Sequence, residues 1–311
     1  MAYQTATLPP NATATLIADF ISWAVAQAGF TLGNTWTFTG GYTARSIYRD
    51  GQYVNLAWLT TNPNKLFLNT SSNHPSSGTL TAQTNCYTSD YEIHLGTSPI
   101  RYWMFADGYS AHCAVEWTGG AFQHINVGML EKLGTYTGGV YVSGSHWKTT
   151  HYAQVGTTSY HSRPFEPLVP SQSFAPVGHV RCQYTPPGGS LLHVHALAQN
   201  SGYFGGFAIN LGTGTLSGTD LPRRPLGRSP NSYNGRTVIC PTILAIAETD
   251  ASSPDSYIPI GQVKNAGHCN IANLDPGSTV NTDWMVFPWS AKNAGGTSFV
   301  NSLNYGIAYK K

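Results

Sequence analysis

The stretch RYWMFADGYSAHCAVEWTGGAFQHINVGML, from Arg101 to Leu130, decides the fold of this chain. It contains runs of β-branched, aromatic and small apolar residues, separated by ADG and TGG, which are turn sequences. EIHL before it and VYVSG after it continue the same rhythm, with a turn roughly every eight to twelve residues. This spacing is typical of an antiparallel meander or sandwich, so we expect Tyr91 to Trp147 to form one continuous sheet.

Strand patterns flank this block on both sides. Before it, Thr35 to Thr39, Val54 to Thr60 and Lys65 to Thr70 have high β propensity. After Thr237 come the strand-like runs TVICPTILAIA, SYIPIGQV, TDWMVFPW and NYGIAYK, and residues 273–277 read NLDPG, a strong turn signal. The glycine pairs along the chain are expected in hairpin turns, because they lack the strand-loop-helix setting of a phosphate-binding loop.

One helix is expected, near the start of the chain. Asn11, Thr13 or Thr15 could cap its beginning, and Gly29 could end it. The fold class that these patterns predict is mainly β, with antiparallel sandwich-like or barrel-like sheets and a short N-terminal helix. The apolar face of that helix recurs at a spacing of about 3.6 residues and consists of Leu16, Ile17, Phe20, Ile21, Ala24 and Val25.

Prolines indicate where the chain divides. Residues 163–190 hold six prolines, which disrupt strand ladders and favour an extended crossover. Within the segment 220–236, three prolines and four arginines predict an arm that contacts a neighbouring molecule, with a solvated loop as the competing interpretation. The predicted divisions are an amphipathic helix at 1–30, an antiparallel β domain at 31–162, a Pro-rich crossover at 163–190 and a second β domain at 191–311, which carries the arm 220–236.

The shortage of charge is the most informative feature of the composition. Charged residues make up 10% of the 311 residues, against about 25% in ordinary soluble domains. Aromatic residues reach 12%, with 18 Tyr and 8 Trp. Surfaces buried in permanent contacts are depleted in charge and enriched in aromatic residues, so the composition favours a subunit of an assembly. A secreted β-protein or adhesin with a neutral coat is the alternative.

Charge and hydropathy also argue against two classes of partner. The formal net charge is only +2 and there is no basic stripe, so binding to nucleic acid is not expected. The start, MAYQTATLPPN, does not resemble a signal peptide. The longest apolar stretch, around Leu16 to Phe30, is interrupted by Asp19 and is too short to cross a bilayer. We therefore expect a protein that folds in a cytosol and does not use a membrane.

No convincing metal, cofactor or disulfide pattern is present. His193 and His195 would share one face of a strand, as in half of a cupin metal site, but Gln199 stands where the glutamate ligand is expected. Ordinary strand histidines are the preferred interpretation, and these two stay weak metal candidates. The cysteines are odd in number and lack a CxxC pair, so free thiols are expected at Cys86, Cys113, Cys182, Cys240 and Cys269.

Two residue pairs raise the question of hydrolysis. His112 and Cys113 are adjacent, and on a strand adjacent side chains leave on opposite faces, which disfavours a cysteine protease. Asp107 and Glu116 could be the carboxylate pair of a cell-wall glycoside hydrolase. However, Asp107-Gly108 is a turn sequence and Glu116 lies in a strand pattern. We therefore expect no catalytic residues and no enzymatic activity, and keep the hydrolase as an alternative.

The block from Arg101 to Trp147 resembles a stretch of virion structural proteins of tailed bacteriophages. In those proteins an FxD turn is followed by HxxVE, G-x-F-x-H, G-x-L-x-K-x-G and GG-x-Y-x-G. The closing segments NLDPGSTVNTDWMVFPWSAKN and NYGIAYKK also resemble the C-terminal end of such proteins. The residues that match the first set of motifs are Phe105, Asp107, His112, Val115, Glu116, Gly120, Phe122, His124, Gly128, Leu130, Lys132, Gly134, Gly138, Gly139, Tyr141 and Gly144.

The resemblance implies a structural subunit of the phage neck, collar, tail tip or baseplate, in a virion assembled in the host cytoplasm. We expect a homo-oligomer, most simply a ring of three or six copies, in contact with other phage structural proteins. A receptor-binding or carbohydrate-binding tail module is the first alternative, and it would show exposed Tyr or Trp rings in a groove. The interface residues expected from their type and context are Trp103, Tyr109, Trp147, Tyr152 and Trp289, with Arg223, Arg224 and Arg228 on the arm.

Overall fold

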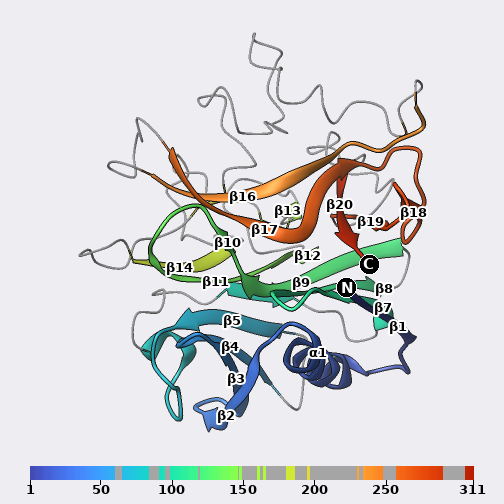
Figure 1. The fold of residues 1–311 in the computed structure, drawn as a ribbon. Helices are drawn as coiled ribbons and strands as arrows, with labels where there is room; N and C mark the ends of the chain where they lie inside the picture. The colour runs from blue at the N-terminus through green and yellow to red at the C-terminus, as the bar shows by residue number, and fades with distance from the viewer. Residues whose placement is uncertain are drawn as a thin grey trace.

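The fold is mainly β, with antiparallel sheets and one helix near the N-terminus, as predicted. Figure 1 shows the arrangement in a computed structural model, in which three sheets lie one above another. The described residues are 1–59, 65–83, 91–94, 99–117, 120–145, 147–148, 160–161, 164–165, 180–185, 195–196, 230, 234–247, 257–289 and 305–311.

The middle layer, here called the central sheet, has six strands in the order β1-β7-β8-β9-β11-β14. Every neighbouring pair is antiparallel. The strands are β1 (Ala2–Thr7), β7 (Pro99–Ala106), β8 (Ser110–Trp117), β9 (Ala121–Met129), β11 (Thr137–Ser145) and β14 (Val180–Thr185).

Below the central sheet in Figure 1 lies the N-terminal sheet, a simple antiparallel meander in chain order. The hairpin between its first two strands turns through Gly40 and Gly41, both with positive φ, as expected of a glycine pair. A short 3-10 helix, η1 (Leu80–Ala82), packs over this sheet. The strands are β2 (Thr31–Phe38), β3 (Tyr42–Arg49), β4 (Gln52–Leu59), β5 (Lys65–Ser71) and β6 (Tyr91–His94).

Above the central sheet lies the C-terminal sheet, ordered β15-β16-β17-β20-β19-β18, with β10 also paired to β17. Two further short strands, β12 (Trp147–Lys148) and β13 (Tyr160–His161), pair with each other. The strands of the C-terminal sheet are β10 (Glu131–Lys132), β15 (His195–Ala196), β16 (Ile239–Ala247), β17 (Tyr257–Asn270), β18 (Thr279–Val280), β19 (Trp284–Pro288) and β20 (Tyr305–Lys310).

The central sheet is buried on both faces. All nine residues of β9 are buried, and successive residues of a strand point to opposite faces. Ile125 and Val127 pack in the core that also contains the helix and the N-terminal sheet. Phe122 lies on the opposite face of β9 and packs with Phe287 and Ile307 of the C-terminal sheet. The protein therefore has two main cores that share the central sheet as their common wall.

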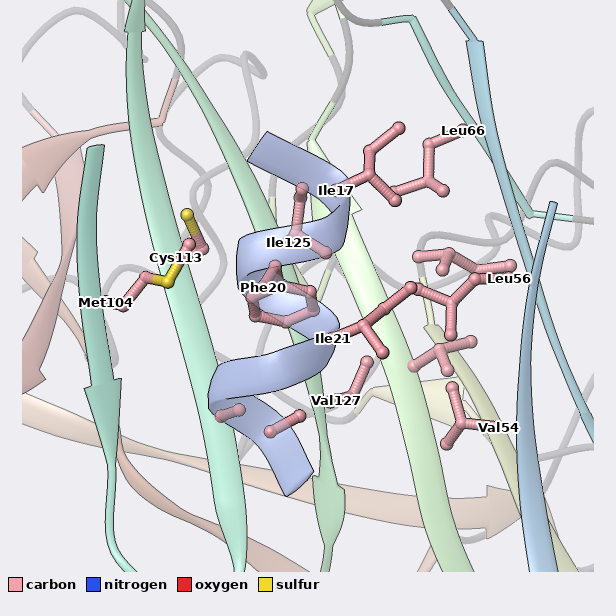
Figure 2. Packing of buried hydrophobic residues seen from close by; sticks show 14 of the residues in the cluster. Ile17, Phe20, Ile21, Val54, Leu56, Leu66, Met104, Cys113, Ile125 and Val127 are labelled. Carbon is pink, nitrogen blue, oxygen red and sulfur yellow. The ribbon is translucent and has the colours of Figure 1, made fainter. Parts of the chain in front are cut away.

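Helix α1 (Thr13–Gln27) fills the space between the central and N-terminal sheets. Figure 2 shows Ile17 and Ile21 directed toward Leu66 and Leu56 of the N-terminal sheet, while Phe20 faces the strands of the central sheet. The helix ends before Gly29, whose φ of 70° is the left-handed conformation expected after a helix C-terminus. The predicted apolar face and the predicted terminator are both confirmed, whereas the N-cap residue is Ala12, which makes no side-chain capping bond, and not one of the predicted Asn11, Thr13 or Thr15.

Several sequence-based expectations need correction. The segment 1–30 is more than a helix, because Ala2–Thr7 forms strand β1 ahead of it. Tyr91 to Trp147 is not one sheet, since β6 pairs with β5 in the N-terminal sheet. The predicted crossover 163–190 contains strand β14, which pairs with β11. β10 joins β17 across the predicted domain boundary, so the two halves share a core.

Removing the aromatic ring of Phe20 tests the role of the helix as a wedge between two sheets. Phe20 is 1% exposed, and Phe20→Ala should lower the free energy of unfolding by about 3–5 kcal/mol through lost burial and the cavity left behind. The exposed Ser22 of the same helix is the matched control, and Ser22→Ala should change stability by less than about 0.5 kcal/mol. Urea unfolding of the two variants measures both, and equal losses would contradict this packing.

Candidate functional site

His124 on β9 lies fully buried between the central and C-terminal sheets. Its Nδ1 is 3.0 Å from the hydroxyl of Tyr309 on β20, and its Nε2 is 2.9 Å from the carbonyl oxygen of Pro288 on β19. An imidazole with Nε2–H donates to the carbonyl and leaves Nδ1 to accept a hydrogen bond. Neutral His124 is therefore a two-ended link that joins the two sheets.

His112 on β8 forms a second link beside the first. Its ring stacks on Tyr309 with centroids 5.1 Å apart, and its Nε2 is 3.0 Å from the carbonyl oxygen of Lys264 on β17. Nδ1 lies 3.0 Å from Oδ1 of Asn126, which also accepts the hydroxyl of Tyr309 at 3.0 Å. The amide Nδ2 of Asn126 is buried without a partner. With the Asn126 amide rotated by 180°, its Nδ2 donates a hydrogen bond to Nδ1 of neutral His112. The Tyr309 hydroxyl then donates to Nδ1 of His124.

Burial makes both histidines poor bases. Loss of solvation lowers the pKa of His124 to about 4, a shift that the Pro288 carbonyl opposes and the nearby His112 reinforces. Desolvation likewise lowers the pKa of His112, and the hydrogen bonds that the ring makes to the Lys264 carbonyl and to Asn126 oppose this shift. Both rings are therefore neutral near pH 7 and inaccessible to a substrate. Their hydrogen bonds hold the sheets together.

The thiols are likewise part of the cores. Cys113, Cys182 and Cys269 are buried, Cys240 is half-buried, and all four are free cysteines, as expected. Desolvation raises the pKa of each of these thiols, which suppresses the reactive thiolate. Cys113 faces the helix while His112 faces the C-terminal sheet, which confirms that the pair cannot act together. The fifth cysteine, Cys86, lies outside the described residues.

Asp107 and Glu116 are too far apart for glycoside hydrolysis. Asp107 lies in the β7–β8 turn, where its Oδ1 accepts the backbone N–H groups of Tyr109 and Ser110. Glu116 lies six residues beyond Ser110, near the other end of β8, which places it about 20 Å away at the rise of a strand. Glycosidase carboxyl groups lie roughly 5–9.5 Å apart. Asp107 and Glu116 are therefore not placed as the carboxylate pair of a glycoside hydrolase.

The residues proposed as metal ligands are only partly described. His195 lies in β15, paired with Ala245, and His193 lies outside the described residues. Within the part of the chain that the structure describes, no group of three or more His, Cys, Asp and Glu side chains could hold a metal. No helix among the described residues is long and apolar enough to cross a membrane.

Tyr109 lies exposed between two cations at the β7–β8 turn. The guanidinium of Arg49 is 4.7 Å from its ring centroid and the ammonium of Lys264 is 4.3 Å away. Arg49 also donates to the carbonyl oxygens of Ala28, at the end of α1, and Gly108. The cluster therefore joins the helix C-terminus, the turn and β17, and leaves 43% of Tyr109 open to contact.

The other predicted interface residues divide into two groups. Trp103 and Trp289 are 6% and 2% exposed and pack in the core between the central and C-terminal sheets, so the prediction of a surface contact was wrong for these two. Their residue type reflects an internal core. Trp147 lies in β12, and its side chain is not described. Tyr152, Arg223, Arg224 and Arg228 lie outside the described residues.

Sequence reasoning missed the most exposed strand of the central sheet. Among the strands that the structure describes, β1 pairs with β7 alone, and its side chains are exposed or half-exposed along its length. Met1 is 55% exposed and Tyr3 is 40% exposed. The available signal was a period of two, in which the β-prone residues Tyr3, Thr5 and Thr7 occupy alternate positions.

Comparison with known proteins assigns this chain to no family. No protein family model matches this chain, and no curated protein matches it significantly.

The buried histidines predict a loss of stability in acid. Above pH about 6.5 both the folded and the unfolded states hold neutral His124, whereas between pH about 6.5 and about 4 only the unfolded state takes up the proton. The free energy of unfolding should therefore fall over this window, by about 3 kcal/mol from His124 alone. His112 should add a change in the same direction.

Chemical denaturation at a series of pH values measures this slope. His124→Gln keeps a donor for the Pro288 carbonyl but cannot titrate, so its acid slope should be clearly shallower than that of the wild type. Ser22→Ala, which removes no titratable group, serves as the control and should keep the wild-type slope. An unchanged slope in His124→Gln would show that this ring does not govern the acid response.

Proposed function

We propose that this chain is a non-enzymatic structural subunit of a bacteriophage particle, at the neck or collar or in the tail or baseplate. It assembles in the host cytoplasm as a homo-oligomer, in a ring of three or six copies that contacts other phage structural proteins. The resemblance of the block from Arg101 to Trp147, and of the closing segments, to tailed-phage virion proteins supports the particle.

The observation that carries the proposal is a low-charge chain that exposes large apolar side chains. Only 10% of the residues are charged. Met1, Tyr3 and Ile100 are exposed at one edge of the central sheet, and Tyr109 is exposed at the β7–β8 turn. Neutral polar and aromatic surface loses water at a smaller cost than charged surface, so such a surface suits burial against permanent neighbours.

The buried histidines and cysteines stabilise the packing between sheets, which is consistent with this proposal. His112 and His124 pair with backbone carbonyls and with Tyr309 inside the sandwich. Three of the four described cysteines are buried. These side chains stabilise the contact between sheets, and a subunit that withstands assembly forces benefits from a core joined by specific polar links.

Quantitative mass spectrometry of purified particles tests the proposal. The chain should be present at a fixed copy number, a multiple of three or six relative to a portal or tail protein of known stoichiometry. It should stay with the particles through a density gradient and a high-salt wash, because neutral buried contacts are not screened by salt. Its absence from particles, with the protein found free in the lysate, would overturn the proposal.

A second candidate function is glycan binding by the outer face of the N-terminal sheet. Tyr48 on β3 and Tyr53 on β4 have ring centroids 5.4 Å apart, and His74 stacks on Tyr53 at 5.3 Å. Aromatic rings on a polar surface are typical contacts for sugars. In this case Tyr53→Ala should abolish binding to host cell-wall glycans, whereas Tyr42→Ala, in a separate ring cluster of the same sheet, should not. Absence of glycan binding by the wild type removes this candidate.

A further inference from the structure

We propose that the outer edge of β1 docks a second copy of this chain through antiparallel pairing of the two β1 strands about a two-fold axis. The inference deepens the proposed function, on which its biological meaning rests, by naming the contact surface and the partner. The paired strands join two central sheets into one sheet that crosses the interface.

The backbone geometry of β1 shows which groups face outward. Leu8 N–H donates to the Ile100 carbonyl at 2.8 Å, and this pair continues the β1–β7 register. In an antiparallel ladder the groups that bond to one neighbour belong to alternate residues, so the even-numbered residues of β1 bond to β7. The N–H and C=O groups of Tyr3, Thr5 and Thr7 therefore point away from the sheet, and no described strand pairs with them.

β1 lacks the devices that protect sheet edges from pairing. Charged residues, proline, bulges and short length are the usual ones. The six residues AYQTAT contain no charge and no proline, and their register with β7 runs without a shift. Exposed and regular, this edge offers about 20 Å of ladder to a partner.

The other long edge of an outer sheet shows the contrast. β2 has a register shift between Leu32 and Thr35, and its side chains bond to the loop after β5. Asn34 donates to the Pro75 carbonyl at 3.0 Å, and Trp36 donates to the Gly78 carbonyl at 2.9 Å. At the C-terminal sheet the two edge strands, β15 and β18, have only two residues each. An interrupted ladder and short length therefore protect these three edge strands, whereas β1 has neither feature.

A second copy fits this edge because β1 is complementary to itself. A two-fold axis at Thr5 places Thr5 opposite its own copy and Tyr3 opposite Thr7, so that all outward-facing backbone groups pair. Only Thr5 lies on this axis and faces its own copy, so a charge at that position would meet a like charge, and β1 contains no charged residue. Tyr3 packs on Phe105 with ring centroids 5.4 Å apart, which leaves its exposed side for the partner strand.

The two-fold contact also bears on copy number. A cyclic ring of three copies contains no two-fold axis, whereas six copies in dihedral arrangement do. The inference therefore favours six copies over three in the proposed assembly.

Sedimentation velocity of the purified chain, with charge-swap variants at Thr5, tests the inference. The wild type should sediment as a dimer of twice 33.5 kDa, in a concentration-dependent equilibrium. Thr5→Lys and Thr5→Glu should each weaken dimerisation by at least about ten-fold, since like charges then meet on the axis. An equal mixture of the two variants should restore a dimer, which only pairing of one copy with another at this position predicts.

Control measurements separate the possible failures. Thr37→Lys on the edge of β2 should leave dimerisation unchanged, and far-UV circular dichroism spectra that match the wild type show that the fold of each variant is intact. A wild-type monomer, or a dimer indifferent to both Thr5 substitutions, would overturn the β1 contact. Neither result would contradict the proposed function as a particle subunit, because the chain could contact its neighbours through another surface. Mass spectrometry of purified particles tests that function separately.

Discussion

Burial of the central sheet on both faces is the constraint on which the rest of this structure depends. Each inner strand of the central sheet must therefore carry two sets of core residues, one on each face. In β9 the odd residues Ile125 and Val127 meet the helix core, and the even residues Phe122 and His124 meet the C-terminal sheet. Where Gly144 approaches the N-terminal sheet, a Cβ would lie 2.4 Å from Ile93, so glycine allows this close contact.

Buried polar groups determine how the central and C-terminal sheets align. Apolar packing alone tolerates sliding, whereas paired polar atoms in a low-dielectric core have directional partners. His112, His124 and Asn126 project from the central sheet toward Tyr309, which stacks on His112 and also on Phe105. A slip of one residue in the pairing of β8 or β9 within the central sheet would turn these side chains to the opposite face and break the hydrogen bonds. The network therefore favours one strand register in the central sheet and one alignment of the two stacked sheets.

The sequence predicted strands better than their partners. Period-two patterns and turn residues located β7, β8 and β9, since these are properties of neighbouring residues. Membership of a sheet depends on contacts distant in sequence, so β6 was placed in the wrong sheet and β1 was missed. Trp103 and Trp289 were read as interface residues because residue type does not distinguish a core within one chain from a contact between chains. The pairing of His112 and His124 with carbonyls of β17 and β19 likewise had no local signal.

The account rests on the idea that a chain with 10% charged residues buries its exterior against other molecules. An electron cryo-microscopy map of the intact phage particle tests this idea most directly. The account predicts density for this chain in the neck, collar, tail or baseplate, with Tyr3 and Tyr109 covered by neighbouring subunits. A map that accounts for every subunit without this chain, or that shows these rings facing solvent, would contradict it.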